Sequence, residues 1–349
     1  MIGPEQRARL NLAKLRAVVR AHTGATTTQD RPLGGLAAVV VGDDGNVQEG
    51  NVQEGRVQDG FVLVSGPTGL GAAVVWALRQ DHPRRLHLIV DTDAEDAPDP
   101  DVLARRAGYF RADPWVYRLV GSELTRAQPA AHEPPLVPDP AALVAMEPLR
   151  AAGVEVVVEH GVVLAEVLGL EVGRVVKDPV RGFHLEVGVG RYDREAARLM
   201  EALRSVEEVT ATVLDVVRGH RRPDQPPHLL NRLARQRWLR ANILVRPELV
   251  GASHLVAMEP PFPRESLIDT TPALASGRRT DGGAVVVACA VGVDPEAIPT
   301  TADARHRFDP EAELVYVCPS RDQYRAVREL AQALRQPARM VTLEGEWTT

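Results

Sequence analysis

The stretch AVVVACAV, residues 284–291, is an uninterrupted apolar run with the length of a buried β-strand. Two further strand-like segments follow it, ELVYVC at 313–318 and RMVTLEG at 339–345. The residues between these strands, 301–308 and 322–335, favour helices. Apolar strands that alternate with helices indicate a largely parallel sheet that is buried on both faces. The C-terminal part of the chain therefore predicts a β-α-β-α-β unit.

A second stretch, near the N-terminus, has the same order of elements. Its three strands and two helices are predicted at 61–66, 71–80, 86–91, 101–110 and 116–121. In both stretches an Asp-Gly turn precedes the first strand, and Gly and Glu closely follow the last. A pattern repeated over this length indicates an internal duplication. An amphipathic helix at 5–21 and a strand at 36–41 precede the first unit.

A smaller segment that mixes helix and strand separates the two units. After a Pro-rich linker at 129–140, its elements are predicted as a helix at 141–152, strands at 154–161 and 183–190 around a hairpin at 162–176, and helices at 193–203 and 206–217. We expect an α/β protein with tandem β-α-β-α-β units at 1–128 and 229–349 and an α+β segment at 136–219. A polar repeat at 45–60 is typical of an expanded surface loop.

The composition limits where the protein works. The longest apolar runs fall far short of the roughly 20 residues that a membrane-spanning helix needs, so no membrane partner is expected. Residues 1–20 contain no apolar core of a secretion signal. The two cysteines, Cys289 and Cys318, lie in apolar strand-like runs, which suits a reducing compartment. We therefore predict a cytoplasmic protein.

Positive charge in this chain comes almost entirely from arginine. The only lysines are Lys14 and Lys177, a bias typical of GC-rich bacterial genomes. A phosphate-binding loop of the Walker type needs a lysine that neither position supplies, so this class of site is excluded. The net charge of −6 is mild, so any nucleic-acid binding must come from a local patch.

The residues 231–318 resemble the PD-(D/E)XK superfamily, in its mismatch and restriction endonuclease-like branch. The likeness rests on RWLRANILVRPELVGASHL at 237–255, IDTTPALA at 268–275, DGGAVVVACAV at 281–291 and ELVYVC at 313–318. These segments are similar to the family's helix and turn, its Asp-bearing strand, its Glu-x-Lys strand and its last strand. The resemblance implies an endonuclease-like fold for this part of the chain.

The catalytic positions of that family are not kept. Ala288 and Ala290 stand where the family carries Glu-x-Lys, and Asp269 alone lies near the first acidic position. A methyl group can neither bind a divalent metal nor orient a water molecule. In the N-terminal unit the corresponding strand offers only Ser65 and Gly66. The leading hypothesis is a non-catalytic scaffold or nucleic-acid-binding protein derived from a nuclease, with no cofactor.

Three acidic residues of the middle segment form a candidate metal site. They are Glu166 and Glu171 on the hairpin and Glu186 on the following strand. Together they could hold Mg²⁺ or Mn²⁺, with Lys177 in place of the missing lysine, and act as a metal-dependent phosphodiesterase. His160 and His184 could add ligands or be ordinary histidines. Alternatively, strand alternation places these glutamates on the solvent face of an antiparallel sheet.

A glycine-rich turn between a strand and a helix is a candidate nucleotide site. Its residues are Gly66, Gly69 and Gly71, with Asp91 at the end of the next strand. The spacing departs from G-x-G-x-x-G, and Pro67 removes a backbone donor that would face phosphate. The alternative is a tight turn in which a glycine packs closely against the sheet.

A cluster of arginines is a candidate nucleic-acid site. It surrounds Trp238 and comprises Arg218, Arg221, Arg222, Arg232, Arg235, Arg237 and Arg240. The alternative is a solvated helix face, with Arg232, Arg235 and Arg240 outward and Trp238 packed inward. Protein partners and a homo-oligomer stay open as further possibilities.

Overall fold

The computed structural model describes residues 3–24, 29–30, 36–42, 58–66, 69–79, 85–190, 193–195, 206–222, 228–263, 266–345 and 347. The chain divides into two compact units. The first holds Met1–His132, Pro295–Asp303 and Arg325–Pro337, and the second holds Glu133–Asp294, Ala304–Tyr324 and Ala338–Thr349. Each of the three segments expected from the sequence contains one β-sheet. The α/β class is confirmed.

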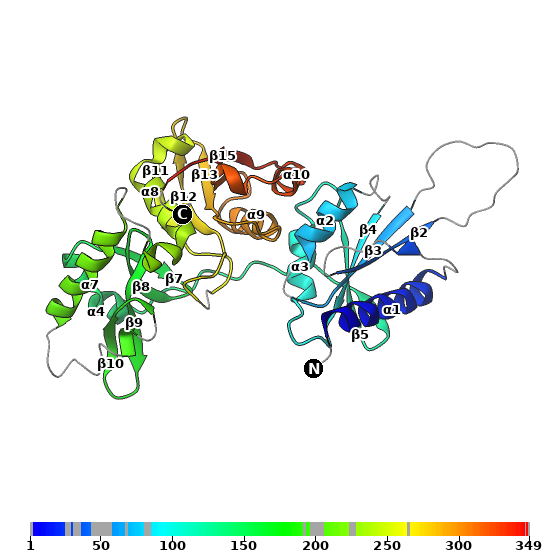
Figure 1. The fold of residues 1–349 in the computed structure, drawn as a ribbon, viewed down its shortest axis with the longest axis horizontal. Coiled ribbons are helices and arrows are strands. Elements are labelled where there is room, and N and C mark those ends of the chain that lie inside the picture. Colours follow the sequence, from blue (N-terminus) through cyan, green and yellow to red (C-terminus); the bar gives the residue numbers. More distant parts are fainter. Residues whose placement is uncertain are drawn as a thin grey trace, which may run out of the picture. The chain divides into compact units, whose positions relative to one another are not determined.

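The first sheet has the strand order β1-β2-β3-β4-β5-β6. Its strands are β1 (Gln29–Asp30), β2 (Ala37–Gly42), β3 (Gln58–Val64), β4 (Arg85–Asp91), β5 (Trp115–Val120) and β6 (Glu123–Arg126). The neighbours among β1, β2 and β3 are antiparallel, β3, β4 and β5 are parallel, and β6 is antiparallel to β5. In Figure 1, α1 (Pro4–Thr23) lies on one side of this sheet, with α2 (Leu70–Arg79) and α3 (Pro100–Ala107) on the other.

The helix α1 forms because its sequence carries both end signals and one apolar face. Pro4 occupies the first turn, where its missing N–H costs nothing, and Gly24 ends the helix with a left-handed φ of 71°. Leu15 and Val19 are buried against Phe61 of β3 and its neighbours. This confirms the amphipathic helix expected at 5–21.

The middle sheet is antiparallel, with the strand order β10-β9-β8-β7. Its elements are α4 (Pro140–Ala145), α5 (Glu147–Ala151), β7 (Glu155–Glu159), β8 (Val162–Val167), β9 (Leu170–Asp178), β10 (Gly182–Val187) and α7 (Val206–His220). The single helix expected at 141–152 is wrong. Pro148 has no N–H for an intrahelical bond and disfavours a continuous helix, so the chain begins a new helix after Met146.

The third sheet has the strand order β11-β12-β13-β14-β15. Its elements are η1 (Leu229–Arg232), α8 (Arg235–Val245), η2 (Pro247–Val250), β11 (Ala252–Met258), β12 (Ala273–Arg279), β13 (Ala284–Cys289), α9 (Ala297–Phe308), β14 (Glu313–Cys318), η3 (Ser320–Asp322), α10 (Arg325–Ala333) and β15 (Arg339–Thr342). The pairings β11-β12 and β12-β13 are antiparallel, and β13-β14 and β14-β15 are parallel. These directions are those of β1 to β5 in the first sheet.

Several elements differ from the sequence expectation. The strand β11 was not expected at all. The strand β12 begins at Ala273 rather than within 268–272, because Ser266 and Asp269 form a turn there in which the Ser266 N–H donates to the Asp269 carboxylate. The helix α8 begins only at Arg235, because Ala234 has a left-handed φ of 45°. Most of the repeat at 45–60 and of the helix expected at 193–203 lies outside the described residues.

Among the described residues, none of the helices combines the length and the apolar character that a bilayer crossing requires. Cys289 and Cys318 are buried free thiols, and burial raises the pKa of each to about 12. Both behave as small apolar side chains of the core, as expected.

A buried histidine lies on the face of the first sheet that α1 covers. His87 of β4 stacks on Phe61 with ring centroids 4.3 Å apart and on Tyr117 at 5.8 Å. Its Nε2 lies 3.5 Å from a carboxylate oxygen of Asp59. Burial outweighs this carboxylate and lowers the pKa of His87 to about 4. The imidazole is therefore neutral at physiological pH.

This histidine makes the stability of the fold depend on pH. Because the unfolded chain binds a proton near pH 6.5 and the folded chain only near pH 4, stability is full above pH 6.5 and falls as the pH drops toward 4. The loss by pH 4 is up to about 3 kcal/mol. We expect urea unfolding between pH 7 and pH 4 to show it, and His87→Phe to flatten the curve. Equal slopes for the wild type and His87→Phe would contradict this.

Candidate functional site

A group of four buried charged residues lies inside the second compact unit. Glu159 of β7 and Glu166 of β8 meet Arg237 and Arg240 of α8, and none of the four is more than 5% exposed. Arg237 donates to both glutamates, and Arg240 Nη2 donates to Glu166 Oε2 at 2.6 Å. We call these residues the ion-pair tetrad. With two positive and two negative charges it is electrically neutral, the condition under which buried charge is tolerated.

The turn between β8 and β9 packs directly on α8. Gly169 has a φ of 74°, and a Cβ atom there would lie 2.2 Å from the Arg237 carbonyl oxygen, so only glycine fits. Arg221 reaches the same place, where its Nη1 donates to the Leu168 carbonyl at 2.6 Å and its guanidinium lies 5.0 Å from the centre of the Trp238 ring. Burial lowers the pKa of Arg221 to about 9. The hairpin is thus fixed to the helix through backbone contacts as well as through the tetrad.

A cavity of about 450 Å³ lies beside the tetrad. Its walls come from four parts of the second unit: the strands β7 to β9 with the turn after β7, the segment after β10, the residue after η1, and the loop after β11. The lining residues are Glu159, His160, Val162, Leu164, Glu171, Arg174, Gly190, Arg194, Leu233, Pro263, Ser266, Leu267 and Ile268. The volume lies within the roughly 300–1,000 Å³ of small-molecule sites.

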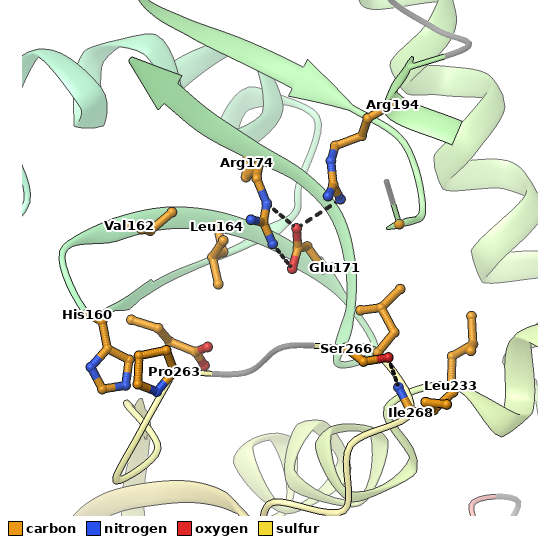
Figure 2. A pocket seen from close by; sticks show the side chains of 13 residues that line it. His160, Val162, Leu164, Glu171, Arg174, Arg194, Leu233, Pro263, Ser266 and Ile268 are labelled. Carbon is orange, nitrogen blue, oxygen red and sulfur yellow. Dashed lines mark hydrogen bonds and ion pairs between the residues drawn. The ribbon is translucent and has the colours of Figure 1, made fainter. Parts of the chain in front are cut away.

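One wall of the cavity carries a charged network (Figure 2). Glu171 of β9 is 1% exposed and receives Arg174 through Nε at 2.7 Å and Nη2 at 3.0 Å. Arg194 adds a third bond from its Nη1 at 3.2 Å. Arg194 Nε also lies 3.7 Å from Glu186 Oε2. Two arginines and two glutamates therefore balance one another at this wall.

The positive charges of the two arginines in the network differ in how well neighbouring carboxylates compensate for their burial. The hydrogen bond to Glu171 raises the pKa of Arg174 above its ordinary value. Burial lowers the pKa of Arg194, and the attraction of Glu171 and Glu186 does not make up for it. A further anion would therefore stabilise the charged form of Arg194 more than that of Arg174.

The structure divides the three glutamates expected to bind metal. Glu166 belongs to the tetrad, whereas Glu171 and Glu186 share Arg194. The expectation that they lie on a solvent face is wrong for Glu166 and Glu171, because the arginines of α8 and of the network cover them. A Mg²⁺ or Mn²⁺ ion would have to displace these arginines. The part of the chain that is described contains no group of three or more His, Cys, Asp or Glu side chains placed to hold a metal ion. The metal site stays a prediction.

The arginines expected to bind nucleic acid separate into two sets. Arg221, Arg237 and Arg240 are buried in the contacts above, so the expectation of Arg240 on a solvated helix face is wrong. Arg218, Arg222 and Arg232 are exposed, and Arg235 is half-buried. Trp238 is buried, which confirms its inward packing. The exposed set is the part of the cluster that a nucleic acid can reach.

The glycine turn of the first unit holds a carboxylate of the protein itself. The backbone N–H groups of Gly69 and Gly71 donate to Glu296 Oε1 at 3.0 and 2.7 Å. A Cβ at Gly71 would lie 2.1 Å from the Pro295 carbonyl oxygen, and a Cβ at Gly69 would lie 2.8 Å from Val64 of β3. The close packing of a glycine against the sheet is confirmed at Gly69, and Gly71 packs on another segment.

The acidic partner expected for a nucleotide ribose is also occupied. Asp91 at the end of β4 receives Lys14 of α1, whose Nζ lies 2.7 and 2.8 Å from the two carboxylate oxygens. Gly66 lies at the start of the same turn, and among the described residues beyond its chain neighbours no atom lies within 4 Å of a Cβ built there. Nucleotide binding at this turn stays a prediction, and a phosphate would compete with Glu296 for the same N–H groups.

The positions at which the expected resemblance would place Glu-x-Lys are apolar core. Ala288 and Ala290, on and just after β13, are buried. Asp269, near the first acidic position of the family, accepts the Ser266 N–H at 2.9 Å. Comparison of the chain with models of protein families, with curated proteins and with solved structures found no match. The endonuclease resemblance therefore stays a proposal.

The tetrad predicts a strong penalty for removing one charge. Arg240→Met leaves the buried tetrad with one excess negative charge, and we expect a loss of about 3–5 kcal/mol in the free energy of unfolding by urea titration. Adding Glu166→Gln restores neutrality, so the double variant should recover part of this loss. Arg150→Met, which breaks an exposed pair with Glu147, should cost less than about 1 kcal/mol. A double variant less stable than Arg240→Met would contradict the charge-balance argument.

The glycine turn predicts opposite outcomes for two similar substitutions. Gly71→Ala forces a methyl group onto the Pro295 carbonyl, and we expect a loss of about 1–3 kcal/mol. Gly66→Ala meets open space, and it should be neutral or stabilise by up to about 1 kcal/mol. Thermal unfolding of the two variants measures the difference. Equal melting temperatures would show that Gly71 is not needed for this contact.

Proposed function

We propose that this chain is a non-catalytic binding protein derived from a nuclease, and that it contacts nucleic acid through exposed arginines. The observation that carries the proposal is the pair of buried alanines, Ala288 and Ala290, at the positions where the resembling family carries Glu-x-Lys. Methyl groups in the core offer neither a metal ligand nor a proton acceptor. The frame of a nuclease without these groups fits binding rather than hydrolysis.

The architecture supports a common origin of the two outer units. In both sheets the first three strands are antiparallel neighbours and the next two pairings are parallel. In both, a helix precedes the sheet and helices connect the parallel strands. We infer tandem endonuclease-like β-α-β-α-β units on either side of the α+β middle segment, as an internal duplication would produce. Both cysteines are free thiols, which favours a cytoplasmic location.

The surface proposed for nucleic acid is the exposed arginine set. Arg218 and Arg222 lie at and just after the end of α7, and Arg232 ends η1. Arg218 also donates to the carbonyls of Ala152 and Gly153, which orients its guanidinium at the surface. Contacts of this kind bind phosphates without reading sequence. The interaction should therefore be salt-sensitive and similar for DNA and RNA.

The test is binding of a fluorescent single-stranded oligonucleotide at several salt concentrations. Each lost phosphate contact lowers the slope of log K against log salt by about 0.7, so Arg222→Ala with Arg232→Ala should lower it by about 1.4. The matched control, Arg7→Ala with Arg9→Ala, removes two exposed arginines from α1 and should leave the slope unchanged. The oligonucleotide should stay intact with Mn²⁺. Unchanged binding by the first variant, or cleavage, would overturn the proposal.

A further inference from the structure

The cavity beside the tetrad is lined by both charged and apolar side chains. We propose that it binds a small amphipathic anion: a carboxylate or phosphate monoester headgroup placed against Arg174 and Arg194, with an apolar body directed away from them. This inference does not depend on nucleic-acid binding, because the exposed arginine set does not line the cavity. It assigns to the middle segment a ligand of its own.

The two arginines keep donors that their ion pairs do not use. Within the described residues, Arg174 binds Glu171 through Nε and Nη2, which leaves its Nη1 for a ligand. Arg194 binds Glu171 through Nη1 and faces Glu186 through Nε, which leaves its Nη2. Figure 2 shows both side chains converging on Glu171 at one side of the cavity. Each arginine thus keeps one terminal donor that can reach an oxygen of a carboxylate or phosphate.

The charges around the cavity favour an anion over a cation. Both carboxylates of the lining, Glu159 and Glu171, already accept arginine hydrogen bonds. Burial lowers the pKa of Arg194, and the attraction of Glu171, Glu186 and Asp193 does not restore its ordinary value. An anionic headgroup would supply the missing compensation, whereas a cation would have to compete with arginines for the glutamates.

The apolar lining of the cavity comes from both sides. Val162 and Leu164 belong to β8, where Leu164 pairs with Arg174 of β9, whereas Leu233, Leu267 and Ile268 come from segments outside that sheet. Ile268 is 71% exposed. Cover by the apolar body of a ligand would remove this surface from water and stabilise the complex by roughly 25 cal/mol for each Å² buried. A ligand without an apolar body would lose this contribution.

A histidine provides a further polar group at the cavity. His160, in the turn between β7 and β8, has a φ of 49°, and its backbone N–H donates to Glu259 at 2.9 Å. Its Nε2 atom is buried and has no hydrogen-bond partner among the described residues. Figure 2 places the ring away from Arg174 and Arg194, near Pro263. A hydroxyl or carbonyl on the apolar body would satisfy this nitrogen.

The experiment is isothermal titration calorimetry of the full chain with four probes. Octanoate and phenyl phosphate carry the two headgroups, and octylamine and benzyl alcohol are the cationic and neutral controls. We expect at least one anionic probe to bind and to bind at least tenfold more tightly than either control. If neither anion binds, or if octylamine binds as tightly, the proposal is overturned.

Two variants locate the binding. Arg194→Met removes a hydrogen-bond donor for the headgroup and should weaken binding of the anionic probe at least tenfold. Ile268→Trp adds a large side chain at the apolar part of the cavity from an exposed position and keeps every ion pair. It should also weaken binding of the anionic probe at least tenfold. This variant tests the proposal even if Arg194→Met does not fold. Arg7→Met on α1 is the matched control and should bind the probe like the wild type. Binding that is unchanged in both Arg194→Met and Ile268→Trp would overturn the proposal.

Discussion

The second compact unit depends on the neutrality of one buried group of charges. Two arginines of α8 can be buried because they form ion pairs with two glutamates of the β7-β8 hairpin. The two glutamates can be buried for the same reason. This requirement fixes the helix against the hairpin. The position of α8 in turn places Leu233 and the loop at 266–268 opposite Glu171, and so defines the cavity. Charge balance in the core thus determines the shape of the candidate site.

The same use of charge recurs through the described parts of the chain. Lys14 neutralises Asp91, Arg105 holds Asp303 with bonds of 2.8 and 2.9 Å, and Glu296 meets backbone N–H groups at the start of α2. Side chains whose type and spacing resemble a metal, nucleotide or nucleic-acid site are largely occupied by internal partners. In this arginine-rich chain, side chains that resemble a functional motif therefore serve internal packing. Arg174 and Arg194, which keep donors without partners among the described residues, are more informative about ligands.

Sequence patterns predicted the fold better than the site. The apolar runs at 61–66, 284–291 and 313–318 are strands because few other structures bury such segments, and α1 follows from its helical periodicity. The edge strand β11 escaped prediction because its sequence, ASHLVAM, lacks a clean alternation. Period-2 alternation wrongly predicted a solvent face for Glu166, because it could not show that arginines of α8, 71 and 74 residues further along the chain, cover this side chain. The charged network also escaped prediction, since Arg194 lies beyond the end of β10 and only the folded chain brings it to Glu171 and Arg174 of β9.

The contact of Glu296 with the glycine turn has a consequence for phosphate compounds in solution. A side chain joined to its own binding site by the fold acts as a tethered competitor, and its effective concentration is on the order of millimolar or more. A free anion must exceed this competitor in affinity before it can occupy the two N–H groups. Glu296 therefore keeps the turn at the start of α2 occupied, and anions that bind weakly do not displace it at ordinary cellular concentrations.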